Sequence, residues 1–310
     1  MGLVVSLANT GEPLFIVNRE GSRPSHEGAA AYIDQAIDLC RRGGFNEILL
    51  RGDTDFSQTQ HLDRWNADNV VFVFGFDAIK PLKARADALE EDTYAELARR
   101  AKRAFVEDDD RRARQPRVKE DVVRRKGYKN IRLRSEDIAE FDHRPGACKT
   151  TYRMVVLRKN LSIERGEKSL FDEVRYFFYI TNDRAMSAEQ VVYNSNDRCN
   201  QENLIGQLKS GVRALHAPVN TLNANWAYMV MAGLAWSLKA WMALSLPVSP
   251  RWRAKHEAER RAWLRMEFRT FLQSVIDIPA QILHTGRRLI WRLLAWRPQL
   301  PVLFRLLNTV

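Results

Sequence analysis

Cysteine is scarce in this chain, and a signal for export is missing. The three cysteines, Cys40, Cys148 and Cys199, are widely spaced and form neither a CxxC pair nor a set with metal-ligand spacing. The first residues lack the basic segment and the long apolar run of a secretory signal. We therefore expect the protein in a reducing, intracellular compartment.

Acidic residues are outnumbered by basic ones. The chain has 49 Lys and Arg against 38 Asp and Glu, a net charge of +11 and a pI of about 9.8. A polyanionic partner, either nucleic acid or an anionic membrane surface, would suit this charge, although a basic soluble protein would show it too. The apolar fraction of 45% in 310 residues supports a packed core in one elaborated domain or two, and excludes a disordered chain.

One long apolar run stands out. Residues 226–246 are almost continuously apolar and have about the length that spans a bilayer. The run contains Lys239, a glycine and serines, and its tryptophans are spread through it instead of lying at its two ends. These features favour a buried core helix, with a membrane span as the alternative.

The first 80 residues have the pattern of an α/β sheet. Short apolar runs at 3–8 and 13–17, joined by a glycine turn, predict a β-hairpin. Apolar residues at helical spacing predict a helix that follows Ser25 and ends at Gly43-Gly44. A strand, a short helix and a second strand are predicted at 47–51, 57–65 and 70–76. This order predicts a sheet with a parallel part.

The middle of the chain is basic and the last third is helical in pattern. Residues 99–134 contain 15 Lys and Arg against six Asp and Glu, which suits either a solvated surface or a surface that follows phosphates. Strand-like runs follow between 130 and 180. From Ser187 the pattern is helical almost to the end, with Pro247 and Pro250 as a boundary. A cationic membrane-surface helix is the alternative for residues 287–307.

Asp53 is the first candidate for chemistry. It follows the predicted strand 47–51, and functional groups collect at the carboxyl ends of strands in α/β sheets. Gly52 before it allows a close approach of backbone or ligand. A turn-capping role would explain a single Asp at this place equally well. Asp55, two residues later, is interpreted as a structural turn or helix-start residue.

The second candidate is the segment that contains Arg198, Glu202 and Lys209. On a helix, positions 198, 202, 205 and 209 fall on one face, so that a carboxylate lies between two cations. A metal ion on the carboxylate and phosphates on the cations would suit this arrangement. Intrahelical ion pairs worth only a few tenths of a kcal/mol are the alternative, and spacing alone does not separate the two.

Three segments together resemble a known family. They are RGDTDF, then YNSNDRCNQENLIGQLK, then NWAYM with LAWSLKAW, and the phrases LANTGE and REGSRPSHEG reinforce them. The chain resembles the DDE transposases of bacterial insertion sequences from about residue 3 to residue 300. More narrowly, it resembles the group with a Tyr-Arg-Glu-Lys (YREK) signature around the last catalytic carboxylate.

The resemblance implies an α/β fold with an RNase H-like (retroviral-integrase-like) core. Asp53 matches the second catalytic Asp and Glu202 the catalytic Glu, both as ligands of Mg²⁺ or Mn²⁺ in a two-metal centre. Arg198 and Lys209 match the DNA-contacting residues of the signature at the family's spacing. Tyr193 is the candidate for the Tyr of the signature, and it stands five residues before Arg198 instead of the usual three.

One departure from the family pattern limits the expected activity. The first catalytic Asp of such enzymes lies on a core strand that precedes the hairpin, and this chain starts inside the hairpin. Asp34 and Asp38 lie on the first predicted helix and are not expected to replace it. We expect the carboxyl-terminal part of a transposase, inactive alone, whose missing central strand leaves a sheet edge open.

The resemblance also gives a domain layout and partners. We expect an RNase H-like core lacking its first strand, interrupted by a basic, partly β insertion and followed by a helical C-terminal region. The segments are 1–80 (core, first part), 81–175 (basic insertion), 176–246 (core, catalytic-Glu helix and core helix) and 247–310 (basic helical region). The implied partners are transposon ends and target DNA, with a homodimer for the full-length form, no membrane, and a cytoplasmic, nucleoid-associated location.

Three functions remain to be separated. The first is the truncated DDE transposase, and the second is a non-catalytic DNA-binding regulator of transposition. The third is a membrane-associated basic protein, which rests on residues 226–246 and 287–307. Salt-dependent DNA binding without Mg²⁺-dependent cleavage would favour the second, and fractionation into the soluble phase would remove the third.

Overall fold

The computed structural model describes residues 2–97, 122–123, 125–166, 168–197 and 199–308. They form two compact units, which are described separately. Unit 1 comprises Met1–Leu39 and Cys199–Val310, and unit 2 comprises Cys40–Arg198. Arg198 and most of the basic segment 99–134 lie outside the described residues.

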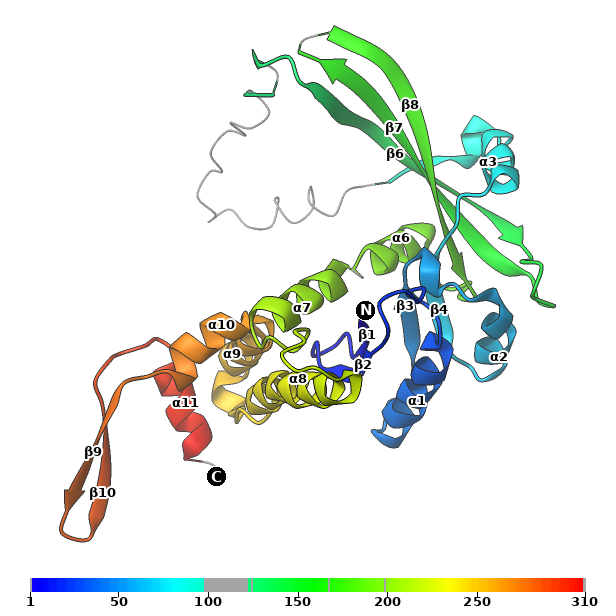
Figure 1. Ribbon diagram of the computed structural model, residues 1–310. Helices are drawn as coiled ribbons and strands as arrows, with labels where there is room; N and C mark the ends of the chain where they lie inside the picture. Colours follow the sequence, from blue (N-terminus) through cyan, green and yellow to red (C-terminus); the bar gives the residue numbers. More distant parts are fainter. Residues whose placement is uncertain (1, 98–121, 124, 167, 198, 309–310) are drawn as a thin grey trace. The chain divides into compact units, whose positions relative to one another are not determined.

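A six-stranded sheet with the order β3-β4-β8-β7-β6-β5 forms the centre of unit 2 (Figure 1). β3 pairs with β4 in parallel, and all other neighbours are antiparallel. The strands predicted between 130 and 180 are confirmed, and they continue the sheet of β3 and β4 because β8 pairs directly with β4. The strands are β3 (Leu49–Gly52), β4 (Val71–Phe76), β5 (Ala95–Glu96), β6 (Lys129–His143), β7 (Tyr152–Arg165) and β8 (Lys168–Thr181).

Alternation along β4 gives this sheet two covered faces. Phe72 and Phe74 point to one face. There the ring centroid of Phe74 lies 5.9 Å from that of Trp65 in α2 (Leu62–Ala67). Val73 points to the other face, where it packs with Val191 and Val192 of α6 (Ala188–Asn196). Helices on both faces bury the parallel pair, as the apolar runs predict. Unit 2 also contains η1 (Thr54–Phe56), η2 (Thr59–His61), α3 (Lys80–Asp87) and η3 (Glu91–Thr93).

Unit 1 begins with the predicted hairpin, which is confirmed. β1 (Gly2–Ser6) pairs antiparallel with β2 (Pro13–Asn18), and Gly11 in the turn has a φ of +74°. The predicted first helix is α1 (Ala29–Arg42), and Gly44 follows it with a φ of +87°, a conformation that favours glycine at helix ends. The carboxyl-terminal elements are α7 (Cys199–Ser210), α8 (Leu222–Leu244), η4 (Pro250–Trp252), α9 (Arg253–Arg265), α10 (Phe268–Phe271), η5 (Leu272–Ile276), β9 (Ala280–Thr285), β10 (Arg288–Leu293) and α11 (Leu300–Leu307).

The long apolar run forms α8, which packs along one side only. Met229 and Trp236 are buried in a cluster with Ile16 of β2, Leu204 of α7 and Phe268 of α10. Trp226 extends this contact, since its Nε1 donates to the Ile16 carbonyl oxygen at 2.6 Å. The other side of α8 is exposed, and 33% of its most apolar window is buried. By length and composition α8 could cross a membrane, which is weak evidence because core helices pass the same test.

The prediction of a helical chain almost to its end is wrong between residues 280 and 293. β9 and β10 form an antiparallel hairpin there, with Thr285 opposite Arg288. The two loop residues are Gly286, which has a φ of +54°, and Arg287. A positive φ at the first loop residue suits a two-residue hairpin turn, and glycine adopts it without strain. Gly286 therefore ends one apolar run and reverses the chain before the next.

Candidate active site

Asp53 lies where β3 ends, as the sequence predicts. Its backbone is extended, and its carboxylate Oδ1 accepts a hydrogen bond from the Asp55 backbone N–H at 3.1 Å. The carboxylate thus caps the short helix η1, which is the structural role that the sequence left open. Asp55 is exposed in the first turn of η1, in agreement with its interpretation as a turn residue. Capping fixes the Asp53 carboxylate at the carboxyl end of the parallel pair.

Two glycines let the backbone pass closely at this point. A Cβ atom on Gly52 would lie 2.8 Å from the Cβ of Phe56 and 3.1 Å from Cδ1 of Phe74. A Cβ atom on Gly75 of β4 would lie 3.1 Å from the Thr54 nitrogen. Distances this short exclude a side chain at position 52 without movement of its neighbours. Tight packing around both glycines therefore determines where Asp53 sits.

Arg51 connects the strand of Asp53 to the end of α6. Its Nη1 donates to the Asn194 carbonyl oxygen at 3.4 Å and lies 4.0 Å from Oδ2 of Asp197. Arg51 pairs with Val73, which faces α6, and Asp53 follows two residues later in extended backbone. Alternation therefore places the Arg51 and Asp53 side chains on the face of the sheet that α6 covers.

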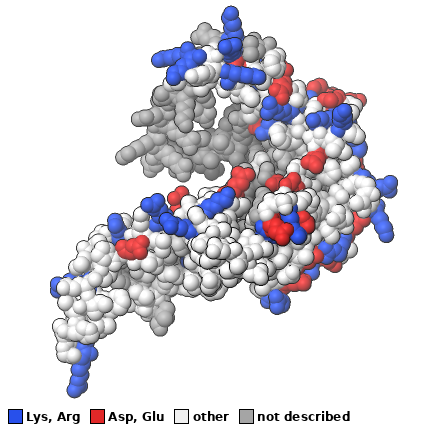
Figure 2. Space-filling model, in the orientation of Figure 1, with Lys and Arg blue, Asp and Glu red and all other residues white. Residues whose placement is uncertain are grey.

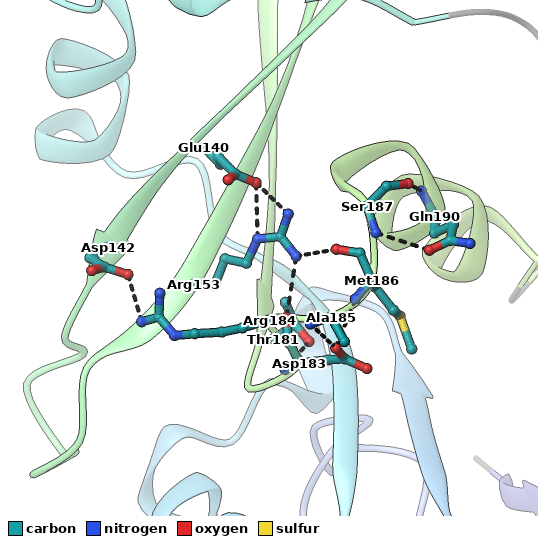
Figure 3. A network of polar contacts seen from close by, with 10 residues as sticks. All are labelled: Glu140, Asp142, Arg153, Thr181, Asp183, Arg184, Ala185, Met186, Ser187 and Gln190. Carbon is teal, nitrogen blue, oxygen red and sulfur yellow. Dashed lines mark hydrogen bonds and ion pairs between the residues drawn. The ribbon is translucent and has the colours of Figure 1, made fainter.

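The other end of α6 is held by Arg153 of β7 (Figure 3). Arg153 is 8% exposed, and its guanidinium donates to the Glu140 carboxylate and to the carbonyl oxygens of Asp183 and Met186. The first turn of α6 is closed by a capping box between Ser187 and Gln190. Both ends of α6 are thus tied to the sheet that carries Asp53.

Glu202 and Lys209 lie on the exposed side of α7 in unit 1. Leu204 and Leu208 of the same helix are buried, at 5% and 0% exposure, and pack toward α8 and α10. Because 202 and 209 are seven residues apart, they share a direction on the helix opposite these two leucines. Glu202 stands in the first turn, where a carboxylate is favoured by the helix dipole.

Tyr193 has a structural role that is visible in unit 2. It is half-buried on α6 and packs against the cluster that contains Val191 and Val192. Its place in a DNA-contacting signature stays a prediction, as does that of Lys209. Arg198, the remaining cation of the signature, lies outside the described residues.

Asp53 and Glu202 belong to different units, so their pairing in one centre also stays a prediction. Carboxylate oxygens are the ligands that Mg²⁺ and Mn²⁺ prefer, so the donor chemistry of both residues fits these ions. Among the residues that the structure describes, no group of three or more His, Cys, Asp and Glu is placed to hold a metal ion. Each of the two carboxylates could supply part of the ligands of a divalent cation. A complete site would need both of them together, or a further carboxylate.

Comparison with known protein families decides the class of this chain. A family model described as "Transposase DDE domain group 1" matches residues 3–310. The chain belongs to this transposase family. No curated protein matches it at a significant level. DNA is the partner that membership of the family implies, and DDE domains generally use divalent metals.

Arg51 is a residue of the candidate site that the motifs do not single out. Its signal in the sequence is a cation at the end of an otherwise apolar strand, directly before Gly52-Asp53. Gly75 gives no clear signal in the sequence either, because a glycine inside an apolar strand shows its purpose only when the strand beside it is known.

Proposed function

We propose that this chain is the carboxyl-terminal part of a DDE transposase of the YREK group, from a bacterial insertion sequence, with Asp53 and Glu202 as its metal-binding carboxylates. The observation that carries the proposal is the position of Asp53 at the carboxyl end of β3, on the face covered by α6. The α/β architecture of unit 2 is compatible with the RNase H-like core of such enzymes. Family membership across residues 3–310 adds the reaction class.

The proposed reaction is hydrolysis and transfer of phosphodiester bonds at transposon ends. When bound, a pair of Mg²⁺ or Mn²⁺ ions would activate the attacking oxygen and stabilise the leaving oxygen. Asp53 and Glu202 would hold the ions, with Arg51 and Arg153 fixing α6 around Asp53. Arg198 and Lys209 would contact phosphates on either side of Glu202, and Tyr193 would contribute to the same DNA surface.

The open edge of β3 supports the part of the proposal that concerns the first catalytic Asp. β3 is at the end of the six-stranded sheet, and β1 and β2 pair only with each other among the described strands. A further strand bearing an Asp could pair with the free edge of β3. We propose that residues 1–310 alone bind DNA without cleaving it because that carboxylate is not among them.

The test compares two chains on duplexes carrying the ends of the element. Residues 1–310 are expected to bind with strong salt dependence and to leave the strands uncut in Mg²⁺. A chain extended by an upstream Asp-bearing reading frame is expected to cut, and Asp53→Asn or Glu202→Gln in that chain to abolish cutting. Clear cleavage by residues 1–310 would refute the proposed inactivity, and cleavage by the extended variants would refute both site assignments.

A non-catalytic regulator of transposition would use the same DNA-binding surfaces. It differs in one property, since it has no need for Asp53 and Glu202 to bind metal. The genomic DNA upstream of residue 1 also separates the two: an interrupted Asp-containing reading frame favours a transposase remnant. In either case we propose a cytoplasmic, nucleoid-associated protein, with a homodimer for the full-length form.

A further inference from the structure

The β9–β10 hairpin is an arm that extends from unit 1. It projects away from α9, α10 and α11 of the same unit (Figure 1). Ile282, Leu289 and Trp291 of the hairpin are 53%, 54% and 65% exposed. A lone two-stranded hairpin is marginally stable in water, so an arm of this kind is expected to gain a partner.

The two faces of the arm differ in chemistry. Residues directly opposite each other in the pairing share a face. One face carries Arg288 with Thr285 and Arg292 with Gln281, separated by the pair Ile290 and Leu283. The opposite face carries the apolar residues Ala280, Ile282, Leu289, Trp291 and Leu293, together with His284.

Charge in this region has one sign only. Residues 278–310 contain five arginines and no Asp or Glu. Figure 2 shows basic side chains near the end of the arm and no acidic ones on the visible side of it. Arg288 and Arg292 are exposed, and within the described residues no hydrogen bond or ion pair of their side chains is found. The face they define suits a polyanion.

The dimensions of this face match duplex DNA. Arg288 and Arg292 are four residues apart on one strand, which places their Cα atoms about 13 Å from each other. The major groove of B-DNA is about 12 Å wide and admits a two-stranded β-ribbon. In a ribbon that lies along the groove, the two arginines of β10 follow one edge of the groove and can contact phosphates there, while Gln281 and Thr285 lie beside them on β9 as hydrogen-bonding groups.

We propose that the β9–β10 arm binds duplex DNA as a two-stranded ribbon, through the face that contains Gln281, Thr285, Arg288 and Arg292. The proposal rests on the proposed function for its partner, because transposase-family membership is what favours DNA over an anionic membrane. It adds a DNA-contacting surface that is separate from the signature residues on α7. Phosphate contacts by the two arginines position the arm, and the two polar residues face the groove floor.

The experiment measures binding of the whole chain to a fluorescein-labelled duplex by anisotropy across a KCl series. The slope of log K against log salt is negative, and each phosphate contact contributes about 0.9 to its magnitude. Arg288→Ala with Arg292→Ala is therefore expected to reduce the magnitude of the slope by about 2. Arg288→Lys with Arg292→Lys, which keeps the charge, is expected to retain the slope. Thr285→Glu adds repulsion on the same face and is expected to weaken binding while circular dichroism stays unchanged.

Arg265→Ala with Arg269→Ala is the matched control, because it removes the same charge, at the same separation of four residues, from exposed positions outside the arm. An equal fall in slope for both pairs would show diffuse attraction and overturn the ribbon. The ribbon would also be overturned by a different pair of results. In these, the arm variant keeps the slope of the unaltered chain, and the chain binds phosphatidylglycerol vesicles in a way that requires Trp291. Failure of the unaltered chain to bind duplex at low salt would overturn the proposed function itself.

Discussion

Gly75 of β4 lies against the peptide bond that links Asp53 to Thr54. A Cβ atom at position 75 would lie 3.1 Å from the Thr54 nitrogen and 3.3 Å from the carbonyl carbon of Asp53. The contact is with backbone, which cannot move away as the end of a flexible side chain can. The position of the candidate catalytic carboxylate therefore depends on a residue that has no side chain.

We expect Gly75→Ala to destabilise unit 2 by about 1–3 kcal/mol, the usual cost of overpacking. Gly146→Ala is the matched control, because a Cβ atom there has nothing within 4 Å. It should change the free energy of unfolding by less than about 0.5 kcal/mol. Urea unfolding measures both, and hydrogen exchange should show lost protection in residues 49–56 of the Gly75 variant alone. Equal effects of the two substitutions would contradict the tight packing around Asp53.

Asp63 should make the stability of unit 2 sensitive to acid. Its carboxylate accepts hydrogen bonds from the Tyr152 hydroxyl at 2.6 Å and from the backbone N–H groups of Lys149 and Thr150. The Tyr152 bond first, and then the Lys149 bond, lower the pKa of Asp63 below its ordinary value. A lowered pKa contributes stability above about pH 4 that is lost as the pH falls through the folded-state pKa.

Asp63→Asn is accordingly expected to cost about 1.5–3 kcal/mol near pH 7, the range for a hydrogen bond to a charged group. The difference from the unaltered chain should shrink as the pH falls below about 4. Urea unfolding over a pH series measures this, with Asp92→Asn, an exposed carboxylate of the same unit, as the control. A difference that stays constant with pH would exclude the proposed role of ionised Asp63.

How much of this structure the sequence predicts depends on the range of the interactions. The hairpin β1–β2, helix α1 and strands β3 and β4 follow from local periodicity and glycine turns, and their positions are confirmed. The hairpin at 280–293 was missed because Arg287 and Arg288 at its turn, among apolar residues, also fit an amphipathic helix. Gly286 was the available signal, since glycine between two short apolar runs indicates a turn.

The site shows the same limit. The placement of Asp53 after a strand follows from the sequence, because it needs only the end of one apolar run. The contact of Arg51 with Asn194 joins positions 143 residues apart, and no periodicity reports such a contact. The distance between Asp53 and Glu202 likewise depends on contacts between residues far apart in the sequence. Family resemblance gives an expectation for it, and local sequence patterns give none.

Because of Lys239, the free energy of unfolding of unit 1 should increase with pH in the alkaline range. Lys239 is 2% exposed. Its Nζ lies 4.2 Å from the centroid of the Trp236 ring and donates to the carbonyl oxygens of Leu264 and Met266 at the end of α9. Burial lowers its pKa to about 8. Between that value and about 10.4 the unfolded chain binds the proton that the folded chain has lost, so stability increases with pH.

Lys239→Met removes this titration. Relative to that variant, the unaltered chain should gain up to about 3 kcal/mol in its free energy of unfolding as the pH rises through this window. Lys255→Met, which changes an exposed lysine of α9, should leave the pH dependence as it is. Chemical unfolding at several pH values between neutrality and about 10.4 measures the difference. A gain of equal size in Lys239→Met would show that other groups cause it.

The central proposal is that Asp53 and Glu202 hold the same divalent cations. Fe²⁺ bound in place of Mg²⁺ generates hydroxyl radicals with ascorbate and peroxide, and these cut the chain next to the metal. Cuts are expected near residue 53 and near residue 202, and excess Mg²⁺ should suppress both. Asp53→Asn and Glu202→Gln should each abolish both cuts, while Asp55→Asn should keep them. Cuts at neither position, or at one position unaffected by changing the other carboxylate, would contradict a shared metal centre.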